Sequence, residues 1–128
     1  MRLLLDTHAL LWWLWDDANL PASARALIAD PENEILVSAA SAWEIATKAR
    51  LGKLPEAGDI AERLSAYVSQ AGFATLEIGL AHAQSAGALP GPHRDPFDRM
   101  MIAQSRLESL PVMTRDPVFR EYGAECLW

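Results

Sequence analysis

The hydrophobic and polar positions of the chain form short apolar runs separated by longer stretches with helical spacing. Three leucines at 3–5 make an apolar run that is too short for a helix, and Asp6 ends it. A strand that is covered on both faces shows such a continuous run, because neither of its faces is exposed to water and no polar residues need to alternate with apolar ones. The pattern therefore predicts a buried parallel strand near the start of the chain, with a carboxylate at its end.

Strands and helices are predicted to alternate along the rest of the chain. Four further strand-like segments are bounded by turn or cap residues, at 34–37, 73–78, 110–114 and 124–128. Helical spacing and cap residues predict helices at 8–17, 21–30, 38–52, 60–71, 79–87 and 96–109. Such alternation is typical of a parallel sheet with helices packed on it. We therefore expect an α/β fold, in one domain over residues 1–128.

The first predicted helix, 8–17, is apolar on almost every side. A helix of this kind is stable only when it is buried on several sides or covered by a partner. Its tryptophans Trp12, Trp13 and Trp15 are therefore candidates for a protein interface. They are equally well explained as core residues, because tryptophan is usually mostly buried.

Composition limits the class of protein. A length of 128 residues with 51% hydrophobic content suits one domain with a single sizeable core. No stretch reaches the roughly 18 apolar residues of a membrane helix, so we expect a soluble, cytoplasmic protein. The single cysteine, Cys126, allows no internal disulfide. A net charge of −6 argues against nucleic-acid binding by a basic surface alone, unless some of the acids hold metal ions.

Acidic residues stand at four points of the predicted pattern. Asp6 and Asp116 each follow a strand, Glu44 lies about two turns into helix 38–52, and Asp95 and Asp98 open helix 96–109. Because strand ends and helix starts meet at one rim of a parallel sheet, these carboxylates are predicted to converge. Each also has a purely structural explanation, since Asp and Glu cap helices and pair with lysines four residues away.

Converging carboxylates need cations or protons. Two of them ~4 Å apart repel by about 4 kcal/mol at an effective dielectric near 20. Mg²⁺ or Mn²⁺ is the expected ligand, because hard divalent cations prefer carboxylate oxygens and the chain has no Cys/His cluster for zinc. Such ions place a water for in-line attack on phosphorus, which predicts a phosphodiester substrate. Basic residues near the acids could position a phosphate backbone, or could be solvated surface charges: Lys48, Arg50, Lys53, Arg94, Arg99 and Arg115.

Four segments carry a resemblance to a known family. They are LLLDTHALLWW at 3–13, SAASAWEIATKARLGKL at 38–54, HRDPFDRMMIAQS at 93–105 and LPVMTRDPVF at 110–119. In this order and spacing the chain resembles a PIN domain, and within that family the VapC-type ribonuclease toxins of prokaryotic toxin–antitoxin pairs. The resemblance implies a three-layer α/β/α sandwich around a parallel sheet and Mg²⁺- or Mn²⁺-dependent cleavage of single-stranded RNA, with one or two ions. It further implies a homodimer and a small antitoxin protein that inserts a tail into the active site.

The resemblance also implies roles for particular residues. The catalytic, metal-binding acids would be Asp6, Glu44, Asp98 and Asp116. Thr7, beside the first acid, would reach a metal-bound water, and Arg99, Thr114 and Arg115 would position the substrate. Asp95 is interpreted as a helix cap rather than an outer ligand. His8 and His93 lie next to site residues, but the resemblance requires neither.

Two other functions compete with the nuclease. A non-catalytic PIN-like module would use the same fold to bind RNA or a protein, with the acids serving only as caps. A response-regulator receiver also gathers acids at strand ends, but it needs an acidic pair after the first strand and a lysine after the last core strand. The chain has Thr7 and His8 after Asp6, and Arg115 after Thr114, which makes the receiver the weakest of the three.

Overall fold

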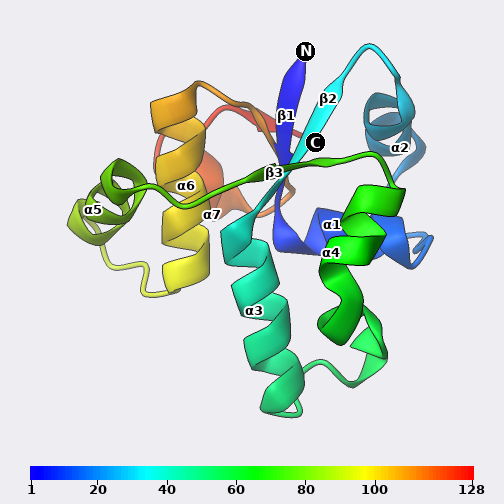
Figure 1. Cartoon of the computed structure of the whole chain (residues 1–128). Helices are drawn as coiled ribbons and strands as arrows, with labels where there is room; N and C mark the ends of the chain where they lie inside the picture. The colour runs from blue at the N-terminus through cyan, green and yellow to red at the C-terminus, as the bar shows by residue number, and fades with distance from the viewer.

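A computed structural model describes all residues of the chain, 1–128. Its centre is a five-stranded sheet in the order β3-β2-β1-β4-β5, and every neighbouring pair is parallel. The strands are β1 (Arg2–Leu5), β2 (Glu34–Ser38), β3 (Ala74–Leu76), β4 (Val112–Met113) and β5 (Cys126–Leu127). Figure 1 shows β1 in the middle of the molecule with helices on both sides of the sheet.

Seven α-helices and one 3₁₀ turn surround the sheet. The helices are α1 (Thr7–Leu14), α2 (Ala22–Ala29), α3 (Ala39–Arg50), α4 (Ile60–Gln70), α5 (Leu80–Ala88), α6 (Pro96–Glu108) and α7 (Pro117–Glu121), and the 3₁₀ turn is η1 (Pro55–Ala57). None of them is long and apolar enough to cross a bilayer. The predicted strands and the six predicted helices are present, with ends shifted by a few residues.

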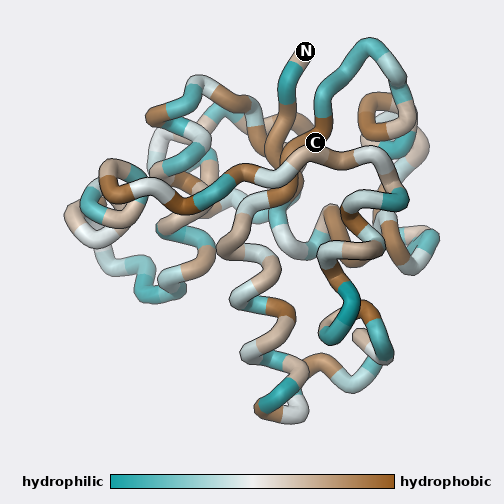
Figure 2. The backbone as a smooth tube through the Cα atoms, in the orientation of Figure 1, coloured by the Kyte–Doolittle hydropathy of each residue, from teal (hydrophilic) through white to brown (hydrophobic).

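Alternate residues of β1 face two separate hydrophobic clusters. Leu3 and Leu5 pack with residues of α1, α2 and α4, whereas Leu4 packs with residues of α5 and α6. The three leucines are fully buried because helices cover both faces of the sheet. The predicted three-layer α/β/α sandwich is therefore confirmed. Figure 2 shows hydrophobic segments along the central strands and hydrophilic ones at the outer turns.

Two features differ from the expectations. The helix α7 was missed, because a five-residue helix is too short to show periodicity, although Asp116 followed by Pro117 marks its start. Trp12 and Trp13 of α1, and Trp15 directly after it, are partly exposed and also pack against the core cluster, so their role in a protein interface stays a prediction. The exposed tryptophan is instead Trp43 on α3, at 53%.

Candidate active site

Strand ends place two of the predicted acids beside each other. Asp6 directly follows β1 and caps α1, and its Oδ1 accepts a 2.7 Å hydrogen bond from the amide of Ala9. Asp116 follows β4 and caps α7 through a 3.1 Å bond from the amide of Val118. Burial raises the pKa of Asp6, hydrogen bonds from Thr114 and Ala9 oppose this shift, and the charge of Asp116 raises the pKa further. The two carboxylates therefore share one electrostatic environment.

The antiparallel packing of α3 and α6 brings a second pair of acids together. Two contacts set their register, Ser38 Oγ to Gln104 Oε1 at 2.6 Å and Ser41 Oγ to Met101 Sδ at 3.6 Å. One more helical turn in the same register places Glu44 of α3 opposite Asp98 of α6. The charge of Glu44 is accordingly among the causes that raise the pKa of Asp98.

Asp98 is the most perturbed acid of the chain. It is the third residue of α6, and its Oδ2 lies 3.0 Å from Nε2 of His93. Burial raises the pKa of Asp98 from 3.8 to about 6, the bond to His93 lowers it, and the charges of Asp95, Glu44 and Asp116 raise it. Because charges from α3 and from the start of α7 act on this one carboxyl as well as that of the neighbouring Asp95, these acids form a single group at the carboxyl end of the sheet.

Glu44 is buried without full hydrogen bonding. Only 4% of the residue is exposed, and its Oε2 forms an ion pair with Lys48 one turn further along α3. Its Oε1 is buried and has no hydrogen-bond partner. Burial by itself would lower the pKa of Lys48, but the bond to Glu44 and the charges of Glu44, Asp95 and Asp98 outweigh it and raise the pKa. A buried, unpartnered carboxylate oxygen costs roughly 1–3 kcal/mol, more when it is charged, so a ligand at this position would stabilise the site.

The acid group suits a divalent cation chemically. Its donors are carboxylate oxygens, which Mg²⁺ and Mn²⁺ prefer, and one of them, Oε1 of Glu44, is left without a partner. As the side chains lie, however, no three His, Cys, Asp or Glu residues are close enough to hold one ion. Binding would thus require small side-chain movements, for which the long side chain of Glu44 is well suited.

The remaining predicted residues have defined contacts. Thr7 is buried, and its hydroxyl lies 2.9 Å from that of Ser41, between α1 and α3. Thr114 is also buried, and its hydroxyl accepts a 3.0 Å bond from the amide of Asp116. Asp95 accepts bonds from the amides of the second and third residues of α6, at 2.9 and 3.2 Å, as the cap interpretation requires.

Arg99 has a different environment from the one expected of a substrate-positioning residue. Its guanidinium donates to the main-chain carbonyls of Ala86 and His93 at 3.0 Å, and also to that of Leu89. These bonds fasten the loop 89–95 to the start of α6, because one side chain bridges α5 and the loop. These contacts give Arg99 a structural role, and its substrate-positioning role stays a prediction. No sequence pattern indicated these contacts, since only the fold brings the carbonyls together.

A cleft adjoins the acid group on the side of α1 and α7. It has a volume of about 280 Å³ and is lined by Asp6, His8, Trp12, Arg115, Asp116, Pro117 and Trp128. We refer to it as the Trp12 cleft. Its aromatic wall was not predicted, because Trp12 and Trp128 lie at opposite ends of the chain and meet only through the pairing of β4 with β5.

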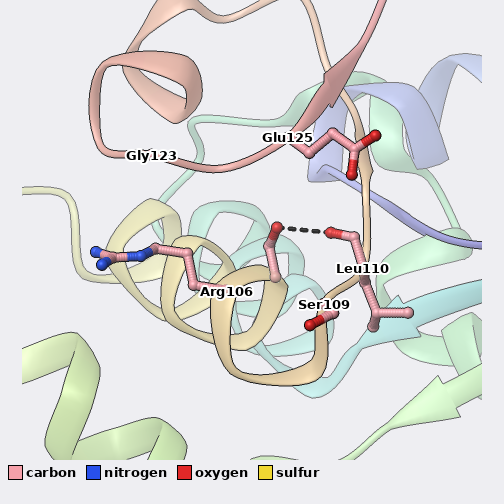
Figure 3. A pocket seen from close by; sticks show the side chains of 6 residues that line it. Arg106, Ser109, Leu110, Gly123 and Glu125 are labelled. Atoms are coloured by element: carbon pink, nitrogen blue, oxygen red, sulfur yellow. Dashed lines mark hydrogen bonds between the residues drawn. The ribbon is translucent and has the colours of Figure 1, made fainter.

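A second, polar pocket lies at the far end of α6. Figure 3 shows Arg106 and Ser109 on one side of it and Gly123 and Glu125 on the other. Because α6 begins at the acid group and its 13 residues span about 20 Å, this pocket is well separated from the acids. It contributes nothing to the candidate site.

The chain is similar in sequence to known proteins. The profile of the PIN domain family matches residues 3–125. Ribonuclease VapC16 of Mycobacterium tuberculosis is 42% identical over 65 residues, which are 51% of this chain and 46% of that protein, so the match spans about half of each.

Two solved structures share the fold over nearly the whole chain. One is VapBC2 from Rickettsia felis bound to a DNA fragment from their promoter, with a TM-score of 0.72, 15% identity and coverage of 99% of this chain and 98% of that one. The other is a toxin–antitoxin complex from Klebsiella pneumoniae, with a TM-score of 0.64, 20% identity and coverage of 98% and 96%. At these identities the likeness shows the fold alone.

Proposed function

Because the chain belongs to the PIN domain family, we propose that it is a metal-dependent endoribonuclease that cleaves RNA in single-stranded regions, acting as the toxin of a toxin–antitoxin pair. The carrying observation is the buried Oε1 of Glu44, which has no hydrogen-bond partner, together with Asp98, whose pKa is raised to about 6 by burial first and then by the charges of Asp95, Glu44 and Asp116. This arrangement destabilises the folded protein, and helix capping alone gives no reason to keep it. It is explained if the group holds positive charge when the protein works.

Mg²⁺ or Mn²⁺ would supply the positive charge and an activated water at this site. Asp6, Glu44, Asp98 and Asp116 would hold it, as one ion or two. Around them, the protein's own cations would attract a phosphate backbone: Lys48 lies beside Glu44, and the exposed Arg115 lies next to Asp116. Phosphate contacts of this kind position a strand without reading its sequence.

Metal binding and RNA cleavage test this proposal together. Wild-type protein freed of any bound partner should bind Mn²⁺ by calorimetry and cleave single-stranded RNA with Mg²⁺ or Mn²⁺. Asp6→Asn and Asp98→Asn should lose both, because each removes a charge from the group. Glu62→Gln is the matched control, since it removes one exposed carboxylate on α4 and should change neither. Wild-type protein that binds no Mn²⁺ and cleaves no cellular RNA would refute the nuclease.

A non-catalytic binding module is the second candidate. It is favoured by the absence of three acid side chains close enough to hold an ion, and by the capping bonds of Asp6, Asp95 and Asp116. On that hypothesis the wild type binds RNA or a protein but no Mn²⁺, and Asp98→Asn leaves that binding intact. The same calorimetric titration therefore distinguishes the two functions.

The partners form part of the proposal. One of the solved structures that share this fold is a toxin–antitoxin complex, which supports a small antitoxin protein as the inhibitor of this chain. We expect its expression to arrest growth, and co-expression of a small protein from the adjacent reading frame to relieve the arrest. We also expect a homodimer, which light scattering at micromolar concentration would detect. Growth arrest that no neighbouring gene product relieves would count against the antitoxin.

A further inference from the structure

The walls of the Trp12 cleft consist of aromatic rings and a guanidinium group. The rings of Trp12 and Trp128 meet edge to face, with centroids 5.6 Å apart and planes at 71°. The guanidinium carbon of Arg115 lies 4.6 Å from the centroid of Trp12 and 6.0 Å from that of Trp128. The ring of His8 lies 5.6 Å from Trp12 at 36°. Unpaired nucleobases stack on surfaces of this chemistry, both aromatic faces and arginine planes.

The floor of the cleft is shared with the acid group. Asp6 and Asp116 line it together with the tryptophans, so a group seated in the cleft lies next to those carboxylates. The two carboxylates of the floor outnumber the single guanidinium of Arg115, so a phosphate there is repelled unless a further cation is bound. An uncharged, flat group avoids that repulsion and gains contact with the rings. A volume of about 280 Å³ accommodates one such ring system rather than a run of several.

Asp6 and Asp116 connect the cleft to the proposed chemistry. In RNA a base and the phosphate of the same nucleotide are joined through one ribose. A phosphodiester held at the acid group would therefore have an adjoining base within reach of the cleft. Trp13 and Trp15, on the same helix as Trp12, do not line the cleft.

We propose that the Trp12 cleft binds the base of a nucleotide adjoining the cleaved phosphodiester, so that stacking on Trp12, Trp128 and Arg115 contributes to the choice of cleavage position. This inference rests on the proposed ribonuclease function. It adds a base-binding subsite to a group of acids that could by itself contact only phosphate. Purines should bind more tightly than pyrimidines, because their larger rings cover more of the wall.

A titration with uncharged nucleosides tests the subsite without any metal ion. The chain has five tryptophans, and each gives one indole N–H signal by NMR. In EDTA, adenosine should shift the signals of Trp12 and Trp128, and uridine should shift them less. The signals of Trp13 and Trp15 should stay in place, as internal controls. No shift at millimolar adenosine, or equal shifts of all signals, would overturn the proposal.

Cleavage of modified RNA tests the consequence for the reaction. Trp128→Leu keeps apolar packing but removes a stacking face, and should lower kcat/KM by about 10-fold, within the range of one lost base stack. Trp128→Phe should retain most activity. When the nucleotide whose base would occupy the cleft is abasic, wild type and Trp128→Leu should have equal kcat/KM. Arg115→Gln removes the guanidinium from the wall of the cleft. Arg106→Gln, which removes a guanidinium from the pocket at the far end of α6, is its matched control.

The outcomes separate the two proposals. If wild-type protein cleaves RNA but Trp128→Leu loses as much activity on abasic as on intact substrate, the subsite is wrong and the nuclease stands. If no RNA is cleaved but adenosine shifts the two signals, the nuclease fails while the cleft still binds bases. Thermal melting of each variant shows whether a loss of activity comes from unfolding.

Discussion

Replacing Asp98 by Asn should stabilise the protein in the absence of divalent cations. The ionised carboxyl of Asp98 is held among Asp95, Glu44 and Asp116, which together with burial raise its pKa from 3.8 to about 6. Asparagine has nearly the same shape and removes the charge. The substitution therefore relieves repulsion while the bond to His93 can be kept by the amide.

The magnitude follows from the pKa. A change from 3.8 to about 6 makes the ionised form about 3 kcal/mol less stable in the folded protein. Screening by water and the lost attraction of a carboxylate to the helix N-terminus reduce the gain to about 1 kcal/mol, since the side chain is 18% exposed. The melting temperature should then rise by roughly 3–5 °C for a domain of this size.

The pH dependence of the stability difference follows from the direction of the pKa shift of Asp98. A carboxyl with a raised pKa in the folded state contributes stability below pH 3.8, and this contribution is lost as the pH rises through about 6. Urea unfolding in EDTA should show the Asn variant to be more stable than wild type at pH 7.5, and the difference should shrink towards pH 4. Glu62→Gln is the control and should show no such gain, because this exposed carboxylate on α4 is not among the charges that act on Asp98. Equal stability of Asp98→Asn and wild type at pH 7.5, or a gain independent of pH, would refute the reasoning.

Three further outcomes are expected. Saturating Mn²⁺ should raise the melting temperature of the wild type but not of Asp6→Asn, in differential scanning fluorimetry with and without EDTA. Gln104→Leu should lower the free energy of unfolding by about 2 kcal/mol in urea titrations, because the fully buried amide bonds Ser38 and a carbonyl of the loop before α5. Arg99→Met should increase amide hydrogen exchange over 89–95, and unchanged exchange there would show that its carbonyl contacts do not hold the loop.

The sequence predicted the structure best in two kinds of segment: runs of consecutive buried residues, and aspartates that end a strand or cap a helix. The run at 3–5 predicted the central strand, because only a strand covered on both faces tolerates three consecutive leucines in so short a segment. Asp6 and Asp116 were identified as strand-end acids by position alone. The site could be anticipated to this extent because sheet topology brings strand ends to one edge, whatever the side chains are.

Contacts between distant segments could not be predicted in the same way. The role of Arg99 depends on four carbonyls of α5 and the following loop, and no sequence pattern shows where a carbonyl will lie. The Trp12 cleft depends on Trp128 reaching α1 through the last strand. The exposure of Trp43 was missed because a tryptophan on a buried helix and one on a surface helix look alike without knowledge of the neighbours.

The cap and ligand interpretations of the acids are compatible rather than exclusive. A cap uses one carboxylate oxygen, Oδ1 of Asp6 towards Ala9 and Oδ1 of Asp116 towards Val118. That bond fixes the side-chain rotamer, and a fixed rotamer also fixes where the second oxygen lies. Capping by an aspartate thus prepares a ligand position at little entropic cost, whereas capping by serine would not. Glu44 caps no helix; its Oε2 pairs with Lys48, and its Oε1 has no partner. In the proposed site we therefore expect the strand-end aspartates to be the rigid ligands and Glu44 to be the adjustable one.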